Sequence, residues 1–126
     1  MAGNSGPGYK RHPDHSVDLE RQGKGVRVTF NGTTIAESDH AITVKETGYD
    51  PVYYLPRDSV RMESLARTEH HTHCPFKGEA SYFSLTVNGR TADNAAWSYE
   101  QPYDEVRDLR NYIAFYPKKV DAIEIA

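Results

Sequence analysis

The sequence predicts a mainly β fold, a small antiparallel sheet that is half-open or rolled, with one or two short helices. Two features predict this class. Apolar and polar residues alternate with a period of two in several short runs, the first at residues 26–30, which is typical of half-buried strands. The pairs Asn31-Gly32 and Asn88-Gly89 follow such runs. They favour type I′ hairpin turns, because both central positions of that turn need positive φ.

Residues 25–55 are expected to form a β-meander whose strands are separated by turn residues. Its strands are expected at residues 26–30, 33–37, 41–46 and 52–55. A short helix near Asp58 and a polar loop over residues 66–72 then lead to a second hairpin. The remaining elements are expected as strands at 79–87, 90–99, 112–116 and 120–125, with a helix at 103–110.

Residues 1–24 are expected to be a flexible N-terminal tail, because they are rich in Gly, Pro, Asn, Ser and charged residues. Within them, the run 15–20 carries two aliphatic residues and is placed along the edge of the domain. Residues 25–126 are expected to be a single β-rich domain. A chain of this length can build a core without disulfide staples.

The 126-residue chain has a formal net charge of −3 at pH 7, which argues against nucleic acid as a partner because phosphate binding needs a basic face. Its single cysteine excludes an intrachain disulfide and is typical of a reducing compartment. The sequence has no apolar run of membrane-spanning length and no apolar centre of a signal peptide. We therefore expect a cytoplasmic protein whose partner is a small-molecule ligand, with neither nucleic acid nor membrane as a partner.

Residues 70–82 concentrate the reactive side chains, because they hold the only cysteine, three of the six histidines and Lys77. Cys74 is a candidate catalytic nucleophile, since the neighbouring cations His71, His73 and Lys77 favour its thiolate form. The alternative is that Cys74 is buried and packs as a small hydrophobic residue.

Lys77 and Gly78 stand where the chain enters the strand expected at 79–87. An ammonium held there by the preceding aromatic residue is a candidate anion anchor and general acid, and the glycine permits close approach of the backbone. The alternative is a turn glycine beside a solvated lysine. The spacing differs from Gly-x4-Gly-Lys-Ser/Thr, so it does not predict a phosphate-binding loop.

The histidines around Cys74 also raise the question of a metal site. Structural zinc usually takes four ligands from paired motifs, and this stretch has one cysteine and no second pair. The local donors are His70, His71 and His73, and distant residues such as His15, His40 or Glu46 would have to complete a site. We predict neither a bound metal nor a cofactor.

Aromatic residues are expected to wall a cavity beside this stretch. Trp97 and Tyr99 alternate onto one face of their strand, and the tight hairpin turn places that strand next to Tyr82. For Trp97 the alternative is core packing, whereas a buried Tyr99 hydroxyl would need a partner, which favours a site.

Three further residues are candidates for binding the ligand: Tyr54, Arg57 and Glu46. Arg57 follows a proline at a strand end, where its guanidinium is suited to an anion. The alternative is an exposed ion pair with Asp58, which contributes little to stability. Glu46 is a candidate general base, but no spacing in the sequence identifies the residue with which it would pair.

Several segments, in a fixed order, resemble one protein family. They are residues 26–32, 46–56, 72–78, 95–99 with Pro102, and 113–116. This order resembles the domain-of-unknown-function family numbered four hundred and twenty-seven, which is also labelled a nucleotidyltransferase-like domain. The resemblance runs from Gly25 to Val120 and leaves the N-terminal tail outside it.

The resemblance implies a compact fold of the tent-like, Mss4-like kind with a pocket between sheets. Many relatives of that fold bind zinc through two cysteine pairs, so the single cysteine here implies that this zinc is absent. The label implies nucleotide chemistry, yet the sequence has no Gly-rich phosphate loop and no Asp-x-Asp magnesium motif. The family pattern carries over, without an established role for any member, onto Tyr54, Pro56, Cys74, Lys77, Gly78, Trp97 and Tyr99.

The sequence leads to three hypotheses about function. The first is a cofactor-free enzyme of the lyase, isomerase or hydrolase type that acts on a small organic acid or biosynthetic intermediate. Lys77 would serve as its acid and His71 or His73 as its base. The second is a non-catalytic module that binds a ligand in the same pocket, and the third is a nucleotidyltransferase. Assembly into a homo-oligomer stays open.

Overall fold

The computed structural model describes residues 3–21, 23 and 25–126. The strands in these residues are β1 (Val17–Glu20), β2 (Val26–Phe30), β3 (Thr33–Ser38), β4 (Ile42–Glu46), β5 (Val52–Tyr54), β6 (Leu65–Cys74), β7 (Gly78–Val87), β8 (Arg90–Ser98), β9 (Ala114–Phe115) and β10 (Ala122–Ile125). The helical segments are α1 (Pro7–Arg11) and the 3-10 turns η1 (Arg57–Ser59), η2 (Met62–Ser64), η3 (Asp104–Leu109) and η4 (Pro117–Lys119).

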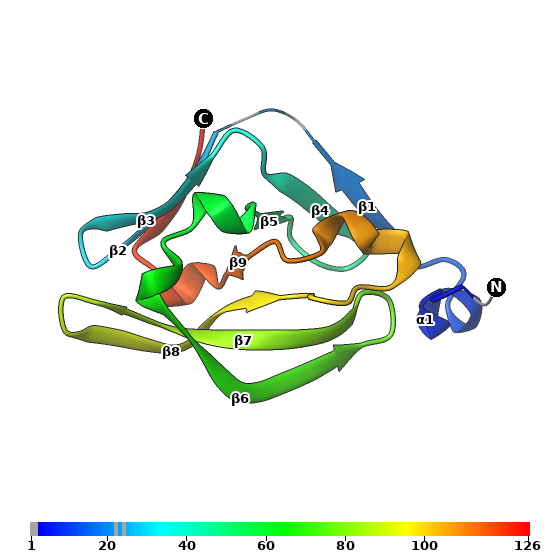
Figure 1. The fold of residues 1–126 in the computed structure, drawn as a ribbon. Coiled ribbons are helices and arrows are strands. Elements are labelled where there is room, and N and C mark those ends of the chain that lie inside the picture. Colours follow the sequence, from blue (N-terminus) through cyan, green and yellow to red (C-terminus); the bar gives the residue numbers. More distant parts are fainter. Residues whose placement is uncertain (1–2, 22, 24) are drawn as a thin grey trace.

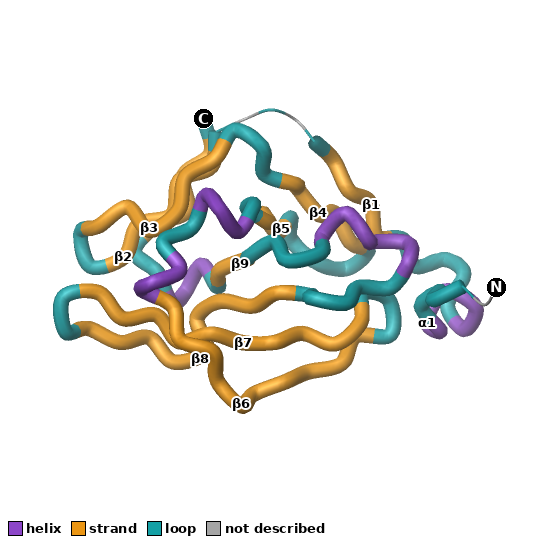
Figure 2. Tube along the Cα trace, viewed as in Figure 1, coloured by secondary structure: helices purple, strands orange, loops and turns teal. Residues whose placement is uncertain are grey.

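The strands form three antiparallel sheets, in the orders β1-β4-β5, β10-β2-β3 and β6-β7-β8-β9. Figure 1 shows the first two sheets inclined towards each other above the long strands of the third, which gives the molecule a tent-like outline. In Figure 2 the 3-10 segments lie in the connections between strands, and α1 precedes the first strand. The predicted class, a mainly β fold of small antiparallel sheets with short helices, is confirmed.

Both predicted Asn-Gly hairpins are confirmed. Asn31 and Gly32 join β2 to β3 with φ values of 49° and 77°, and Asn88 and Gly89 join β7 to β8 with φ values of 50° and 82°. These left-handed conformations are the ones that Asn and Gly adopt most readily. The turns therefore set the register of the two hairpins around which the second and third sheets are built.

The core divides into two clusters. One lies under the second and third sheets and includes Phe30, Leu85 and Ile113, each of which is completely buried. The other gathers around Ile42 and Leu109 and contains most of the buried tyrosines and Trp97. This second, aromatic cluster borders the candidate site described below.

The chain from residue 66 to 72, predicted as a polar loop, is instead part of β6. β6 is an edge strand that pairs with β7 alone, with His71 opposite Ser81 and Cys74 opposite Gly78, and its register shifts between Arg67 and His71. An edge strand with two largely exposed faces needs no alternating apolar pattern. The polar sequence of β6 therefore resembles that of a loop.

The helical segments are short and mostly 3-10 in geometry. The helix predicted at 103–110 is the 3-10 segment η3, whose regular geometry is interrupted at Val106 (φ −126°). The strands predicted at 112–116 and 120–125 are shortened to β9 and β10. Within the described residues, no helix has both the length and the apolar character needed to span a membrane.

The N-terminal residues, predicted as a flexible tail outside the domain, contribute α1 and β1. β1 pairs with β4, with Val17 opposite Glu46 and Leu19 opposite Val44, so it belongs to the first sheet. Figure 1 shows α1 beside the end of the third sheet. The run 15–20, which was expected along the edge of the domain, thus contains an edge strand of the first sheet, although so short a strand carries little compositional signal.

Gly8 of α1 allows this helix to approach the aromatic ring of Phe76. A Cβ atom at this position would lie 2.7 Å from a ring carbon, closer than a carbon–carbon contact permits. We predict that Gly8→Ala lowers the free energy of unfolding by about 1–3 kcal/mol. Urea denaturation measures this loss. Lys10→Ala is the control on the exposed side of the same helix. An unchanged midpoint for Gly8→Ala would contradict the close packing of α1.

Candidate functional site

A pocket of about 770 Å³ opens between the first and third sheets. Its apolar walls come from Val44, Val52, Tyr54, Tyr82, Trp97 and Tyr116. Its polar groups are Glu46, Cys74, Lys77 and Tyr99, and the exposed residues Tyr49, Asp50, Lys118 and Lys119 lie at its mouth. Most of the predicted site residues therefore meet in one cavity: Lys77, Cys74, Tyr99, Tyr54, Trp97, Tyr82 and Glu46.

Lys77 and Glu46 form an ion pair inside the pocket, in which the Lys77 ammonium donates to Glu46 Oε1. Only 11% of each side chain is exposed. Glu46 ends β4 of the first sheet, and Lys77 precedes β7 of the third, so the pair joins the two sheets. Lys77 was predicted as an anion anchor. It is already paired with a carboxylate in the structure, so the inner end of the pocket carries a dipole rather than a single positive charge.

The backbone explains why a glycine follows Lys77. Gly78 has a φ of 115°, which side-chain-bearing residues rarely adopt, and an added Cβ would lie 3.2 Å from the carbonyl oxygen of Gln101. The Lys77 carbonyl accepts a hydrogen bond from the Tyr103 amide at 3.0 Å. The turn between β6 and β7 is therefore fixed at the lysine and at the residue after it, and the lysine side chain lines the pocket.

Most aromatic hydroxyls of the pocket are hydrogen-bonded to other protein groups. Trp97 Nε1 donates to the Tyr54 hydroxyl at 3.1 Å, and the Tyr82 hydroxyl lies 2.9 Å from Thr72 Oγ1 and 3.3 Å from the Tyr116 hydroxyl. The rings of Trp97 and Tyr116 are 4.4 Å apart between centroids. These contacts form a wall of rings whose polar ends are already occupied.

Tyr99 differs from the other tyrosines of the pocket. Only 6% of the residue is exposed, and its hydroxyl has no hydrogen-bond partner among the described residues. Burial raises the pKa of Tyr99 above its ordinary value of 10.0, so the phenol stays protonated at neutral pH. A protonated, unpartnered hydroxyl in a cavity is suited to donate a hydrogen bond to an oxygen atom of a ligand.

Cys74 ends β6 opposite Gly78 and lines the pocket with its side chain half-buried. It therefore meets neither prediction in full, since it packs against the aromatic cluster and also faces the cavity. The histidines that were expected to favour its thiolate lie on the other face of the strand, as described next. Lys77 is the predicted neighbour of Cys74 that shares the pocket with it.

His71 and His73, predicted as the general base, are not among the residues that line the pocket. His71 Nδ1 is 3.4 Å from Glu79 Oε1, and His73 Nε2 is 3.3 Å from the Tyr103 hydroxyl. Side chains alternate across a strand, and Thr72 faces inward to the pocket wall. His71 and His73 therefore face outward. The loop assignment of residues 66–72 concealed this alternation.

Arg57, predicted to bind the ligand, also lies outside the pocket. Its guanidinium donates to the Asn111 carbonyl oxygen at 3.0 Å, to Ser98 Oγ at 3.2 Å and to Glu100 Oε2 at 3.2 Å. Arg67 binds the same Glu100 carboxylate through two hydrogen bonds of 2.7 Å. The strand-end arginine is therefore part of a structural network on another side of β8.

His15 is a neighbour of the pocket that the sequence did not assign to it. His15 Nε2 lies 2.8 Å from Glu46 Oε2, the carboxylate oxygen opposite the one that binds Lys77. From the sequence, His15 is expected only as a distant metal donor, and no motif spacing connects residues 15 and 46. His15 and Glu46 come together because β1 pairs with β4. Only a prediction of that pairing would have found this contact from the sequence.

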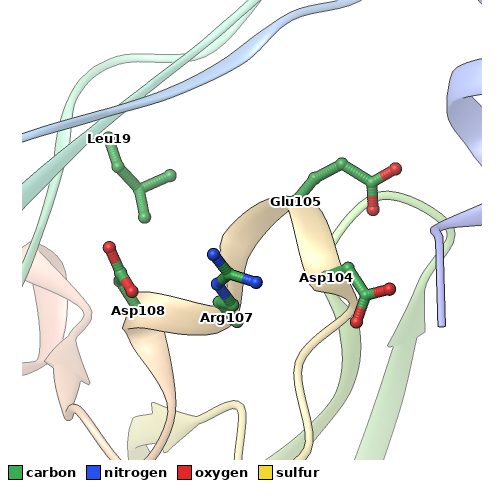
Figure 3. Close-up of a pocket in the computed structure, with 5 residues that line it drawn as sticks. All are labelled: Leu19, Asp104, Glu105, Arg107 and Asp108. Atoms are coloured by element: carbon green, nitrogen blue, oxygen red, sulfur yellow. The ribbon is translucent and has the colours of Figure 1, made fainter. Parts of the chain in front are cut away.

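The described residues contain no group of three or more His, Cys, Asp or Glu side chains arranged to hold a metal ion. A second hollow, of about 410 Å³, lies between β1 and η3, and Figure 3 shows its lining residues Leu19, Asp104, Glu105, Arg107 and Asp108. Two of its carboxylates are occupied by the N-terminal segment. Asp104 accepts from the Asn4 amide at 2.7 Å, and Glu105 accepts from the Gly6 amide at 2.9 Å.

The fold and the pocket define a class, a small tent-like β domain with an aromatic cavity that is also lined by a buried ion pair. A family model described as "Domain of unknown function (DUF427)", with the label NTP_transf_9, matches residues 18–126. The chain therefore belongs to this family, as its resemblance predicted, and the match begins earlier than expected because it includes most of β1. No curated protein matches the chain.

The network around Glu100 predicts a pH-dependent contribution to stability. Hydrogen bonds from Arg67 hold the pKa of Glu100 below its ordinary value of 4.5. Because the folded-state pKa is the lower one, this carboxylate stabilises the fold above the unfolded pKa, and the contribution is lost as the pH falls through the folded pKa. We predict that Glu100→Gln lowers the free energy of unfolding at pH 7 by about 1 kcal/mol.

Urea denaturation from neutral to acidic pH measures this difference, which should shrink below about pH 4.5. Glu63→Gln is the matched control, because Glu63 is exposed in η2. A Glu100→Gln difference that stays constant down to acidic pH would contradict the assignment.

Proposed function

We propose that the pocket binds a small organic molecule with a largely apolar body and an oxygen-bearing group at its inner end, and that it carries out cofactor-free acid–base chemistry on that group. The observation that carries this proposal is the convergence of the Lys77–Glu46 pair and the unpartnered Tyr99 hydroxyl in one aromatic cavity. Base, cation and proton donor are the parts that proton transfer next to a carbonyl group requires.

The size and lining of the pocket support a ligand of this kind. Ligand pockets usually measure about 300–1,000 Å³ and combine apolar walls with a few polar groups. This pocket, at about 770 Å³, falls within that range. Rings such as those of Trp97 and Tyr116 favour a flat body, and the exposed Lys118 at the mouth favours an acid. A small organic acid, which is the ligand class predicted from the sequence, is suited both to the aromatic walls and to the lysine at the mouth.

The chemistry follows from the position of each polar group. The Glu46 carboxylate removes a proton from the carbon next to the ligand carbonyl. The C–H electron pair forms the C=C bond of an enolate, and the π pair of the carbonyl group moves onto its oxygen. The Lys77 ammonium and the Tyr99 hydroxyl stabilise the resulting enolate oxygen. Return of the proton at a neighbouring carbon completes an isomerisation, and loss of a leaving group completes an elimination. Glu46 thus takes the role of base that the sequence gave to His71 or His73.

A non-catalytic binding module is the second candidate, and one observation favours it. Lys77 and Glu46 satisfy each other, and the hydroxyls of Tyr54 and Tyr82 also have protein partners. A pocket with so few unpaired groups is suited to recognition without turnover. Cytoplasmic location and self-association are further proposals that rest on the sequence alone.

Ligand binding is tested with a library of small aromatic and aliphatic acids and the shift in melting temperature that each produces. A ligand present at about 100 times its Kd raises the free energy of unfolding by about 2.7 kcal/mol. We predict that Tyr99→Phe weakens binding of the best ligand by about tenfold, because one hydrogen bond to a ligand oxygen is lost.

The matched control is Tyr53→Phe, since Tyr53 neighbours Tyr54 in β5 but packs against the other core cluster. Equal affinity of Tyr99→Phe and the unaltered protein for every ligand would contradict the assignment of Tyr99. Magnesium nucleotides are included in the same screen. Stabilisation by nucleotides alone would favour nucleotidyl transfer over the proposal.

Proton abstraction is tested without knowledge of the product. The protein is incubated in D₂O with each bound ligand, and NMR measures deuterium incorporation next to the carbonyl group. We predict that Glu46→Gln lowers the rate of incorporation by about 100-fold, the usual contribution of a general base, whereas Glu79→Gln on the exposed face of β7 leaves it unchanged. Ligands that bind but exchange no proton would overturn the enzymatic proposal and leave the binding module.

A further inference from the structure

Residues 4–16, here called the N-terminal strap, run along the outer side of the turn that carries Lys77. The strap is attached at three places. Its start is bound by the carboxylates of η3, as described above. Its middle is bound by the β6–β7 turn, where the Gly8 amide donates to the Pro75 carbonyl oxygen at 3.0 Å. Its end is bound to Thr47, whose amide donates to the Ser16 carbonyl oxygen at 3.0 Å.

Tyr9 reinforces the middle attachment. Its hydroxyl donates to the Phe76 carbonyl oxygen at 2.9 Å, and its ring meets the Phe76 ring edge to face at 5.2 Å between centroids. Burial raises the pKa of Tyr9 to about 12, so the hydroxyl stays protonated and continues to donate at neutral pH. The strap is thus fixed on both sides of His15, by the bonds of Gly8 and Tyr9 before it and by the bond of Ser16 after it.

The imidazole of His15 is held in one orientation. Its ring stacks on Phe76 at 4.0 Å between centroids with an angle of 21° between the planes. Its Nε2 atom is 2.8 Å from Glu46 Oε2, and 18% of its side chain is exposed. A ring that is stacked on one side and hydrogen-bonded at its end has little freedom to turn, so the position of Nε2 is set by the fold.

This arrangement gives each oxygen of Glu46 its own partner. Lys77 binds Oε1 from the pocket side, and His15 binds Oε2 from the strap side. A carboxylate with two fixed partners keeps one orientation, whereas the loss of the outer partner would let it rotate away from the ammonium. The family match covers residues 18–126, so His15 lies outside the matched residues.

We infer that His15 is a positioning residue for Glu46, and that the N-terminal strap supplies it to a pocket that the remainder of the domain leaves incomplete. The meaning of this inference for catalysis rests on the proposed function. The alternative is that the ring of His15 serves only to cover Phe76. A substitution that keeps the apolar cover and removes the hydrogen bond separates the two.

The test measures acylation of individual lysines by acetic anhydride, with the rate at Lys77 divided by the rate at the exposed Lys118 of the same molecule. Four proteins are compared: the unaltered chain, His15→Leu, His15→Gln and His12→Leu. Leucine retains the apolar contact, and glutamine retains a donor near the position of Nε2. His12 is the matched control, because its ring also faces Phe76, at 6.2 Å, and it has no bond to Glu46.

We expect His15→Leu to raise the ratio by about tenfold, because the released carboxylate no longer shields the amine. His15→Gln and His12→Leu should stay within about twofold of the unaltered protein. A ratio for His15→Leu within twofold of the unaltered protein would overturn the inference. So would an equal increase in His12→Leu, since that result would show loosening of the strap rather than loss of one bond.

Circular dichroism and thermal melting of each variant confirm that the lysine ratios are compared between folded proteins. If His15→Leu does not fold, His15→Gln and His15→Asn decide the question, because the Asn side chain is too short to reach Glu46. A raised lysine ratio in His15→Asn alone supports the inference. Equal ratios in the two variants overturn it. The assay contains no ligand and measures no turnover. Failure of the proposed function would leave its result unaffected, and the inference fails only on the lysine ratios.

Discussion

The pocket depends on one interaction, the buried ion pair between Lys77 and Glu46. Taking two charges out of water is costly, and their attraction compensates only while both are present and correctly placed. Glu46 belongs to the first sheet and Lys77 to the turn that opens the third, so the pair holds the two sheets together where they would otherwise expose an aromatic cluster. Removal of Glu46 would leave the Lys77 ammonium beside that cluster without its carboxylate, and removal of Lys77 would leave the Glu46 carboxylate with the bond to His15 but without its ammonium.

The aromatic wall places limits on what the ion pair can do. Trp97 and Tyr54 bond to each other, and Tyr82 bonds to Thr72, so these residues present rings rather than free polar ends to the cavity. Tyr99 alone, among the described tyrosines of the wall, directs an unpartnered hydroxyl to it. The polar groups on which the proposed function rests are therefore the Lys77–Glu46 pair and the Tyr99 hydroxyl.

Local patterns predicted the fold class well, because alternation and Asn-Gly turns act over a few residues. They also predicted that Lys77, Cys74, Trp97 and Tyr99 share a cavity, since one hairpin brings these residues together. They did not predict β6, whose polar edge-strand sequence lacks alternation, so they gave no indication of the face on which His71 and His73 lie. The approach of His15 depends on pairing between β1 and β4, a long-range contact for which the sequence carries little signal.

A double-mutant cycle on the ion pair tests the central claim most directly, with Lys77→Met, Glu46→Gln and the combined variant compared by urea denaturation. Each single substitution should lower the free energy of unfolding by about 3 kcal/mol, because the remaining member of the ion pair stays buried without the opposite charge that it binds in the folded protein. The combined variant should lose about 2 kcal/mol less than the sum of the two, because it leaves no charge behind. Losses that add to within about 0.5 kcal/mol would contradict a coupled pair and, with it, the organisation of the pocket.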